Sequence, residues 1–419
     1  MKILKKVSLF VFTLPILIIL LCGKSYAFHN GGVGECTGCH SMHSTQSESN
    51  YFLKGTDQSS TCLICHENSG DTGPNDYHIS TADSDMPTGV SPKQRTPGGD
   101  FGWLKKSYTI TIGNVTTTEA GERHGHNIVA VDKNYVADNT NSKAPGGSFV
   151  SSELSCISCH DPHGKYRRLG DGTIVKTGTP IMASCSYDNS PDTITGETAA
   201  GVYRLLGGIG FANSKTSNVS FTVNPPIAVA PSNYNRSESS AQTFVAYGKG
   251  MSKWCANCHS DMNSDTGKVF HPDEQDLGSS LANNYNSYVK SGDLTGVQAS
   301  SYLSLVPYEE NSTDYSNLKT IAGKSSSSQL SGPSSNSQVM CLSCHRAHAT
   351  GWNHMFRWNN DVDFIVYNSL WPGTDTTPDN PEFSLGRLGA ETQAAYYDRP
   401  ATIFASYQRS LCNKCHNMD

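Results

Sequence analysis

Cysteine and histidine residues recur in one fixed pattern, Cys-x-x-Cys-His, which occurs six times in this 419-residue chain. Two thiols three positions apart lie on one turn of chain and can form thioethers with both vinyl groups of one porphyrin edge. The next residue can place its imidazole on the iron, where His is the usual axial ligand. The pattern therefore predicts six covalently bound haem c groups. The predicted thioether cysteines are Cys36, Cys39, Cys62, Cys65, Cys156, Cys159, Cys255, Cys258, Cys341, Cys344, Cys412 and Cys415. The predicted proximal histidines are His40, His66, His160, His259, His345 and His416.

Two other kinds of chemistry use paired cysteines. A structural zinc site takes four ligands from paired motifs, and a secreted disulfide framework has no reason to place His after every second Cys. Both alternatives fit the sequence less well than haem. Cys185 lies outside the motifs, and we interpret it as a small buried side chain or a thiol for intermolecular pairing.

Histidines are also numerous enough to fill the opposite face of every iron. The chain has fifteen, so nine remain after the six motif histidines: His29, His43, His78, His124, His126, His163, His271, His348 and His354. No iron therefore needs methionine or an open position. The methionines near the motifs are interpreted as packing residues.

Three motifs extend to Cys-x-x-Cys-His-x-x-His and contribute His43, His163 and His348. A histidine three residues after the proximal ligand lies on the same side of that haem and cannot reach its opposite face. It can bind the iron of a neighbouring haem, provided that the haems are closely packed. We therefore predict these three residues as distal ligands.

Three more distal ligands must come from isolated histidines. We predict His78, His126 and His271, although each could instead be a solvated surface side chain. His124 and His29 are reserve candidates, and His354 is interpreted as a surface residue.

Saturated axial positions argue against catalysis. A haem enzyme that reduces nitrite, hydroxylamine or peroxide needs an iron with an open or labile site. All six motifs end in His, whereas the multihaem nitrite reductases have Lys there at the catalytic haem. The sequence therefore predicts an electron carrier without catalytic residues.

Residues 1–27 have the layout of a secretory signal peptide. Lys2, Lys5 and Lys6 precede an apolar run from Leu9 to Leu21, and Ser25-Tyr26-Ala27 provides a small-residue cleavage site. A retained anchor is one alternative, but the run is short for a span of about 20 residues. Lipidation of Cys22 is another, although Leu21 is large for that signal.

Cleavage after Ala27 would remove four lysines and change the formal charge from −6 to −10. An acidic chain without a basic cluster is a poor partner for nucleic acid. We therefore expect no nucleic-acid partner, and a destination in the periplasm or outside the cell.

Residues 28–419 are predicted to form a single hexahaem unit. Hydrophobic residues make up only 36% of the chain, too few for large conventional cores. The expected fold class is a multihaem cytochrome c, mostly coil and turns with short helices and few short strands, wrapped around a stacked haem chain. We predict a strand in 108–115, short helices in 281–290 and before Cys412, turns at 96–100 and 224–231, and a Ser-rich loop at 325–337.

Longer motifs give the chain a recognisable family resemblance. They include FHNGGVGECTGCHSMH from Phe28, TPGGDFGW from Thr96, SCHDPHGKYRR from Ser158 and CLSCHRAHA from Cys341. In these motifs and their order the chain resembles the OmcS-type hexahaem outer-surface c-type cytochromes, which form extracellular conductive filaments.

The resemblance implies two histidine ligands on every haem, little regular secondary structure and head-to-tail polymerisation. Carried onto this chain, it implies that His43 binds the haem at His345 of the next protomer. Such a heterologous interface does not close, so it propagates a filament.

The resulting hypothesis is long-range extracellular electron transfer through six bis-His haems. Outer-membrane or periplasmic cytochromes would donate the electrons, and iron oxides, other extracellular metal oxides or partner cells would accept them. The alternatives are a monomeric periplasmic or surface multihaem electron shuttle and, less favoured, a multihaem reductase.

Overall fold

The computed structural model describes residues 36–41, 52–68, 77–162, 167–168, 174–175, 206–229, 238, 242, 244–262, 271, 273–323, 329–377 and 381–417. For residues 36–37, 167–168 and 174–175 it describes the backbone alone. Several predicted features lie outside the described residues: the signal segment 1–27, His29, His43, His163 and Cys185.

Regular secondary structure is short throughout the described residues, as expected for the predicted fold class. The longest helix among these residues has ten residues, and no helix among them is long and apolar enough to span a bilayer. The α-helices are α2 (Cys36–Cys39), α3 (Gln58–His66), α4 (Cys156–Cys159), α5 (Met251–Cys255), α6 (Gly278–Ser287), α7 (Tyr315–Ile321), α8 (Cys341–Cys344), α9 (Pro381–Ser384), α10 (Gly389–Ala395) and α11 (Asn413–His416). Single turns of 3-10 helix include η2 (Phe101–Lys105), η3 (Gly121–His124) and η8 (Asn353–Met355).

The strands form small, separate sheets. A four-stranded sheet has the order β5 (Ala228–Val229), β6 (Ala246–Gly248), β7 (Glu309–Glu310), β8 (Ser337–Gln338), in which only β6 and β7 are parallel. The others are two-stranded: β1 (Tyr108–Ile112) with β2 (Val115–Glu119), β3 (Arg167–Arg168) with β4 (Ile174–Val175), and β9 (Phe364–Tyr367) with β10 (Tyr407–Arg409).

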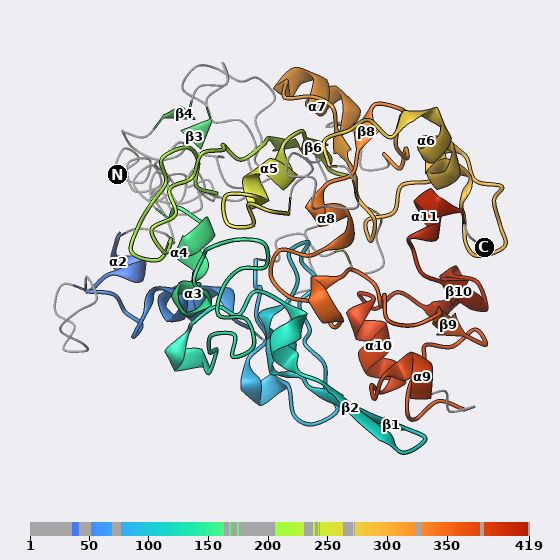
Figure 1. Cartoon of the computed structure of the whole chain (residues 1–419), viewed down its shortest axis with the longest axis horizontal. Helices are drawn as coiled ribbons and strands as arrows, with labels where there is room; N and C mark the ends of the chain where they lie inside the picture. Colours follow the sequence, from blue (N-terminus) through green and yellow to red (C-terminus); the bar gives the residue numbers. More distant parts are fainter. Residues whose placement is uncertain are drawn as a thin grey trace, which may run out of the picture.

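The short helices that carry the Cys-x-x-Cys-His motifs are distributed along the long axis of the molecule. Figure 1 shows α2 near one end, then α3 and α4, α5 and α8, and finally α11 near the other end. Each motif overlaps a helical turn. The order of the motifs along the long axis broadly follows their order in the sequence. Haems attached to these turns would form an extended row rather than a compact cluster.

Two of the three local secondary-structure predictions are confirmed. The predicted strand in 108–115 is β1, which turns at Gly113 into β2 and projects from the body (Figure 1). The predicted helix in 281–290 is α6, which begins three residues earlier.

The predicted helix before Cys412 is wrong. Tyr407–Arg409 forms β10 and pairs with β9, a strand more than forty residues earlier. Gln408 points inward and is fully buried, whereas its neighbours Tyr407 and Arg409 are exposed, which is the alternation of a strand. This long-range pairing overrides the local helical tendency, and α11 begins only at Asn413.

The predicted turns are confirmed in part. Residues 96–100 form a turn closed by the Gly99 N–H on Thr96 O at 3.0 Å. The described residues of the second predicted turn, 224–229, are coil followed by the edge strand β5, and no turn is seen in them. The described residues of the Ser-rich segment, 329–337, are coil until β8 begins at Ser337.

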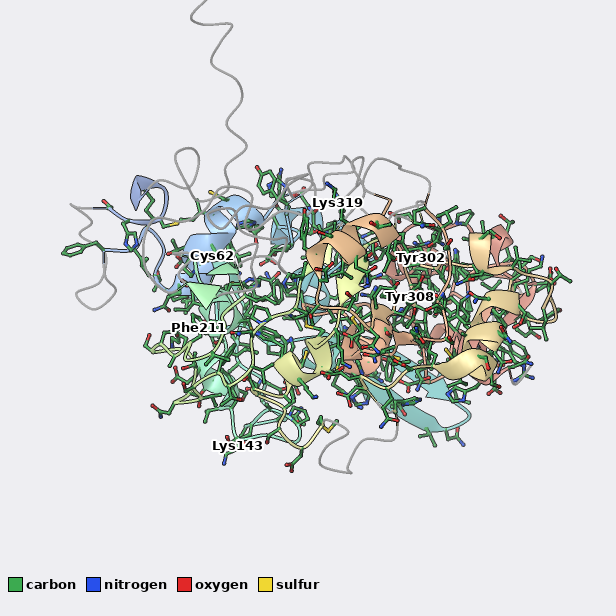
Figure 2. All side chains as sticks on the ribbon, turned by 90° about the horizontal axis from the view of Figure 1, so that it is seen from above. Cys62, Lys143, Phe211, Tyr302, Tyr308 and Lys319 are labelled. Carbon is green, nitrogen blue, oxygen red and sulfur yellow. The ribbon has the colours of Figure 1, made fainter. Side chains whose placement is uncertain are left out.

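Aromatic side chains supply much of the core between the motif helices. The largest cluster contains Tyr285, Tyr302 and Tyr308, and the half-buried Cys344, Cys412 and Cys415 pack against it. Tyr302 and Tyr308 lie side by side in Figure 2, with ring centroids 6.1 Å apart. Smaller clusters border Cys156 and Cys255, so the hydrophobic cores lie directly beside motif cysteines.

Candidate haem-binding sites

The motif cysteines are placed by single helical turns with defined starts. In α4 the Ser158 hydroxyl accepts the Ser155 N–H at 3.0 Å, and in α8 the Ser343 hydroxyl accepts the Met340 N–H at 3.1 Å. Because residues i and i+3 share one face of a helix, both cysteines of each motif can face the same porphyrin edge. The motif cysteines with described side chains form no disulfide.

Consecutive motifs are also joined to each other. Ser59, on α3, accepts the backbone N–H of Cys156 at 3.2 Å, and Ser252, on α5, accepts that of Cys341 at 3.0 Å. Each serine lies three residues before the first cysteine of its own motif. The same connection therefore joins α3 to α4 and α5 to α8.

At both junctions the first cysteines of the two motifs are neighbours. The thiols of Cys62 and Cys156 interact and shift each other's pKa, and those of Cys255 and Cys341 do the same. These thiols would become thioethers on two different porphyrins. Two haem edges attached at such neighbouring sulfurs would lie within contact distance.

Three motif histidines face a predicted distal histidine from a remote part of the chain. The ring centroids are 6.0 Å apart for His126 and His259, 6.4 Å for His160 and His348, and 5.9 Å for His271 and His416. Metal–nitrogen bonds of about 2 Å on both sides of one iron put two imidazole centroids roughly 6 Å apart. All three separations therefore fit bis-His ligation.

Backbone carbonyls orient the imidazoles. The Nδ1 atoms of His66, His126, His259 and His345 lie 2.7–2.9 Å from the carbonyl oxygens of Tyr77, Ala347, Pro145 and His354, respectively. A carbonyl only accepts, so Nδ1 carries the proton and Nε2 keeps its lone pair for a metal. This tautomer and ring orientation are what an axial ligand requires.

Burial also keeps the imidazole rings of four predicted iron ligands neutral. Burial lowers the pKa of His126 to about 4 and that of His348 to about 3. Burial also lowers the pKa values of His259 and His345. The neutral imidazole, which binds iron, is therefore the form present at neutral pH.

The turn at residues 96–100 positions His348. Its N–H donates to the Gly98 carbonyl at 2.8 Å, and its own carbonyl accepts the His126 N–H at 2.9 Å. Gly99 has φ +94°, and a Cβ there would lie 1.9 Å from the Ala349 carbonyl oxygen. Only glycine fits, and the turn thereby positions two of the predicted distal ligands, His348 directly and His126 through it.

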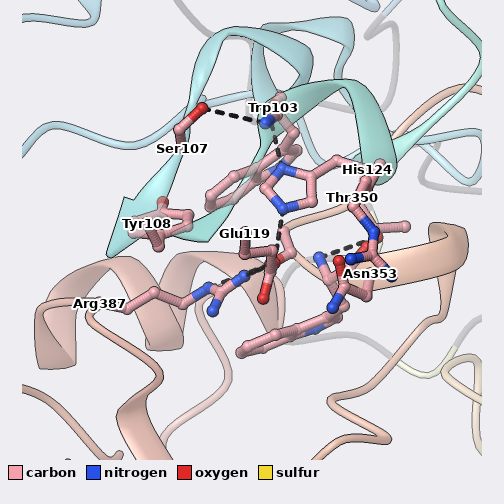
Figure 3. A network of polar contacts seen from close by, with 12 residues as sticks. Trp103, Ser107, Tyr108, Glu119, His124, Thr350, Asn353 and Arg387 are labelled. Carbon is pink, nitrogen blue, oxygen red and sulfur yellow. Dashed lines mark hydrogen bonds and ion pairs between the residues drawn. The ribbon is translucent and has the colours of Figure 1, made fainter. Parts of the chain in front are cut away.

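His124 has a different role from His126, two residues later. Its Nδ1 lies 3.0 Å from the Trp103 carbonyl, and its Nε2 lies 2.6 Å from a Glu119 carboxylate oxygen (Figure 3). Both partners are acceptors, so both ring nitrogens donate and neither has a lone pair for iron. His124 is a buried structural residue, which removes it from the reserve ligands.

The remaining described histidines lie apart from these pairs. His78 is buried, with its ring 4.2 Å from that of Tyr77. His354 lies in η8 at φ +57°, and its Nε2 is 3.2 Å from an Arg123 guanidinium nitrogen. This placement agrees with the interpretation of His354 as a non-ligand.

Known proteins share both the sequence and this structure. The chain is 50% identical to the C-type cytochrome OmcS of Geobacter sulfurreducens over 96% of each chain. The chain belongs to the OmcS family of c-type cytochromes. It also matches the Outer Membrane Cytochrome S filament of that organism with a TM-score of 0.83 and 50% identity, over 94% of this chain and 100% of the other. A cryo-EM structure of OmcS nanowires gives a TM-score of 0.84 and 51% identity, with the same coverage. No protein family profile matches the chain.

Membership of the OmcS family confirms the predicted fold class, a multihaem cytochrome with little regular structure. As a c-type cytochrome the chain holds haem c. The similarity covers nearly the whole chain.

The OmcS-type sequence motifs did not point to two features of these sites. One is the set of carbonyls that orient the imidazoles, because no residue type or spacing marks a backbone carbonyl as an acceptor. The other is a pair of buried arginines, Arg346 and Arg357, which lie 2.8 and 3.8 Å from the same Glu238 carboxylate oxygen. The position of Arg346 directly after His345 is the only signal that could have suggested it.

Proposed function

We propose that this chain is a hexahaem electron conduit in which every iron has two histidine ligands, and that it polymerises outside the cell. The main support is the set of three histidine pairs, in each of which a motif histidine and a remote histidine have ring centroids 5.9–6.4 Å apart. Their motif turns follow one another along the molecule's long axis, as a conduit requires (Figure 1).

The buried arginines support the presence of a large anionic group at these sites. Arg346 and Arg357 are 1% and 3% exposed, and they share one described carboxylate partner, Glu238. Arg346 Nη2 has no hydrogen-bond partner among the described residues. Burying an excess cation is unfavourable without a counter-charge. The propionates of a haem would provide that charge beside His345.

Ligand assignments follow from the pairs. His348, His126 and His271 would serve the haems at His160, His259 and His416. The Tyr77 carbonyl contacts His66 on its Nδ1 side, away from the Nε2 that would bind iron. His78, the next residue, would therefore serve not that haem but the one at His40. His163 would then serve the haem at His66.

The haem at His345 remains, and His43 of the next protomer would complete it. The two OmcS structures that match this chain are a filament and nanowires, which supports self-association by the same contacts. Export through the periplasm would follow cleavage of residues 1–27, leaving a single unit from 28 to 419.

The bound haems supply reversible one-electron chemistry, and the chain's own residues set how it proceeds. The carbonyls at Tyr77, Ala347, Pro145 and His354 hold the imidazoles in fixed orientations, which limits reorganisation during transfer. Six ligand pairs leave no position for a substrate, so we propose no catalytic role. Electrons would enter from outer-membrane or periplasmic cytochromes and leave to metal oxides or partner cells.

Electron microscopy of secreted protein tests this proposal, with His43→Ala beside the wild type. We expect filaments in the wild type and none in the variant, because the inter-protomer ligand is lost. His354→Asn is the matched control, since it removes a non-ligand histidine and Asn tolerates positive φ. It should still form filaments.

A monomeric electron shuttle is the remaining alternative. Wild-type protein that carries six low-spin haems but stays monomeric at every concentration would favour it and rule out the polymer. High-spin haem in the wild type would instead contradict bis-His ligation.

A further inference from the structure

Lys414 is a buried cation inside the C-terminal haem attachment motif. It lies in α11 between Cys412 and Cys415 and is 3% exposed. Its Nζ donates to the Tyr288 carbonyl at 3.2 Å and lies 4.3 Å from the ring centroid of Tyr285. The ring of Tyr288 is 5.5 Å away. Both tyrosines come from α6 and its C-terminal end, which pack against α11.

No described carboxylate forms an ion pair with Lys414. Two other buried cations do have a carboxylate partner: Arg387 pairs with Glu119, and Arg346 pairs with Glu238. Lys414 is held instead by one carbonyl and the faces of two aromatic rings, which favour a cation without neutralising it. Its positive charge therefore acts on its surroundings at low dielectric, where electrostatic effects are large.

Lys414 has no counterpart in the other five motifs. The two residues between the cysteines are Thr-Gly, Leu-Ile, Ile-Ser, Ala-Asn and Leu-Ser in the first five motifs, and Asn-Lys in the last. Only the C-terminal haem therefore has a charged residue between its two thioether links. Haems with identical axial ligands can still differ in potential through the charge and burial around them.

We propose that Lys414 is a potential-setting residue, whose buried ammonium raises the reduction potential of the haem held by Cys412, Cys415 and His416. Oxidised haem carries one more positive charge than reduced haem, so a fixed cation nearby disfavours oxidation. Electrons then reside preferentially on the haem at the C-terminal end of the row. This inference rests on the proposed haem at His416.

The test is a spectroelectrochemical titration of the full-length haem-loaded protein, comparing wild type with Lys414→Gln, Lys414→Met and Lys414→Arg. In the Gln and Met variants we expect about one sixth of the haem absorbance to titrate at lower potential. At a fixed potential its reduced-to-oxidised ratio should fall about tenfold, which is 59 mV for a one-electron couple. Lys414→Arg should retain the wild-type curve, because it keeps the charge.

Lys143→Gln is the matched control, because it removes the same charge from an exposed site away from α11 (Figure 2). Its titration should match the wild type. Unchanged potentials in a neutral variant that carries six low-spin haems would overturn the proposal. So would an equal shift in Lys414→Arg, which would indicate packing rather than charge. Failure of both neutral variants to load the last haem, with Arg loading it, would make Lys414 a folding residue.

The haem proposal itself is tested separately by the wild type. A wild-type haem content below six, or high-spin iron, would contradict the proposed function. Six low-spin haems with no response to Lys414 would contradict only the role of the lysine.

Discussion

Two histidines two positions apart show how the surroundings decide the role of a residue. His124 is the last residue of η3 and His126 follows it, and the two differ in what their ring nitrogens contact. Both nitrogens of His124 donate, to Trp103 and Glu119, whereas His126 donates only from Nδ1 and its ring faces that of His259. Residue type alone therefore does not distinguish a ligand from a structural side chain.

Substitution should separate these roles spectroscopically. In His126→Ala the haem at His259 would lose its distal ligand, so about one sixth of the haem should become high-spin or bind an added ligand. His124→Gln should keep every haem low-spin, because His124 touches no iron site. Absorption and electron paramagnetic resonance spectra of the purified proteins measure both. High-spin haem in His124→Gln would contradict the assignment.

At the scale of elements, the four-stranded sheet buries two carboxylic acids. Glu309, in β7, is fully buried, and one of its oxygens accepts the Gly250 and Met251 N–H groups at 3.3 Å. Burial raises the pKa of Glu309 to about 8, and burial raises that of Glu310 to about 7. Both acids are therefore wholly or partly protonated in the fold at neutral pH.

The raised pKa of Glu309 predicts that the folded state loses stability as pH rises from 4.5 towards 8. The pKa of Glu309 is higher in the fold than in the unfolded chain, so the folded state binds the extra proton between pH 4.5 and about 8. Its contribution is complete below pH 4.5 and is lost as pH rises to 8, at up to about 1.4 kcal/mol per pH unit. Denaturant unfolding against pH should show this slope, and Glu309→Gln should reduce it. The exposed Glu382→Gln should leave the slope unchanged.

At the scale of the whole molecule, buried ion pairs connect distant segments of a chain with little regular structure. Glu119, at the end of β2, contacts Arg387, 268 residues later, as well as His124 (Figure 3). The Arg387 guanidinium also lies over the rings of Tyr108 and Trp352, at 4.1 and 4.7 Å. The network fixes the projecting hairpin to the C-terminal part.

Loss of this carboxylate should destabilise the protein strongly. Glu119→Gln leaves Arg387 buried without its counter-charge, which typically costs about 3–5 kcal/mol of unfolding free energy. Glu153→Gln is the control, since it breaks a half-buried surface pair with Lys215 worth at most about 1 kcal/mol. Chemical unfolding of the haem-loaded proteins measures both, and equal losses would contradict a special role for Glu119.

The same residue predicts how the protein responds to acid. Burial opposes ionisation of Glu119, but the His124 hydrogen bond and the Arg387 charge outweigh it and lower its pKa to about 2. Its folded pKa is below the unfolded value, so its stabilisation is present above pH 4.5 and is lost as pH falls towards 2. The unfolding free energy of the wild type should fall in this pH window, and that of Glu119→Gln should fall less.

The sequence by itself determined the chemistry of this protein. Covalent haem attachment requires a fixed local spacing, because both thioethers and the proximal ligand come from five consecutive residues. The number of motifs, the surplus of histidines and the low hydrophobic content therefore predicted a multihaem cytochrome before any fold was known. The short strand β1 and helix α6 were predictable for the same reason, since their patterns are local.

Only the tertiary structure decided which histidines face each other. His126 meets His259 and His348 meets His160 across 133 and 188 residues, through loops that carry no periodic pattern. It likewise made 407–409 a strand, by supplying β9 as a partner, and turned His124 towards Glu119. These outcomes depend on contacts between distant segments, and a contact energy between two segments is a property of neither sequence alone.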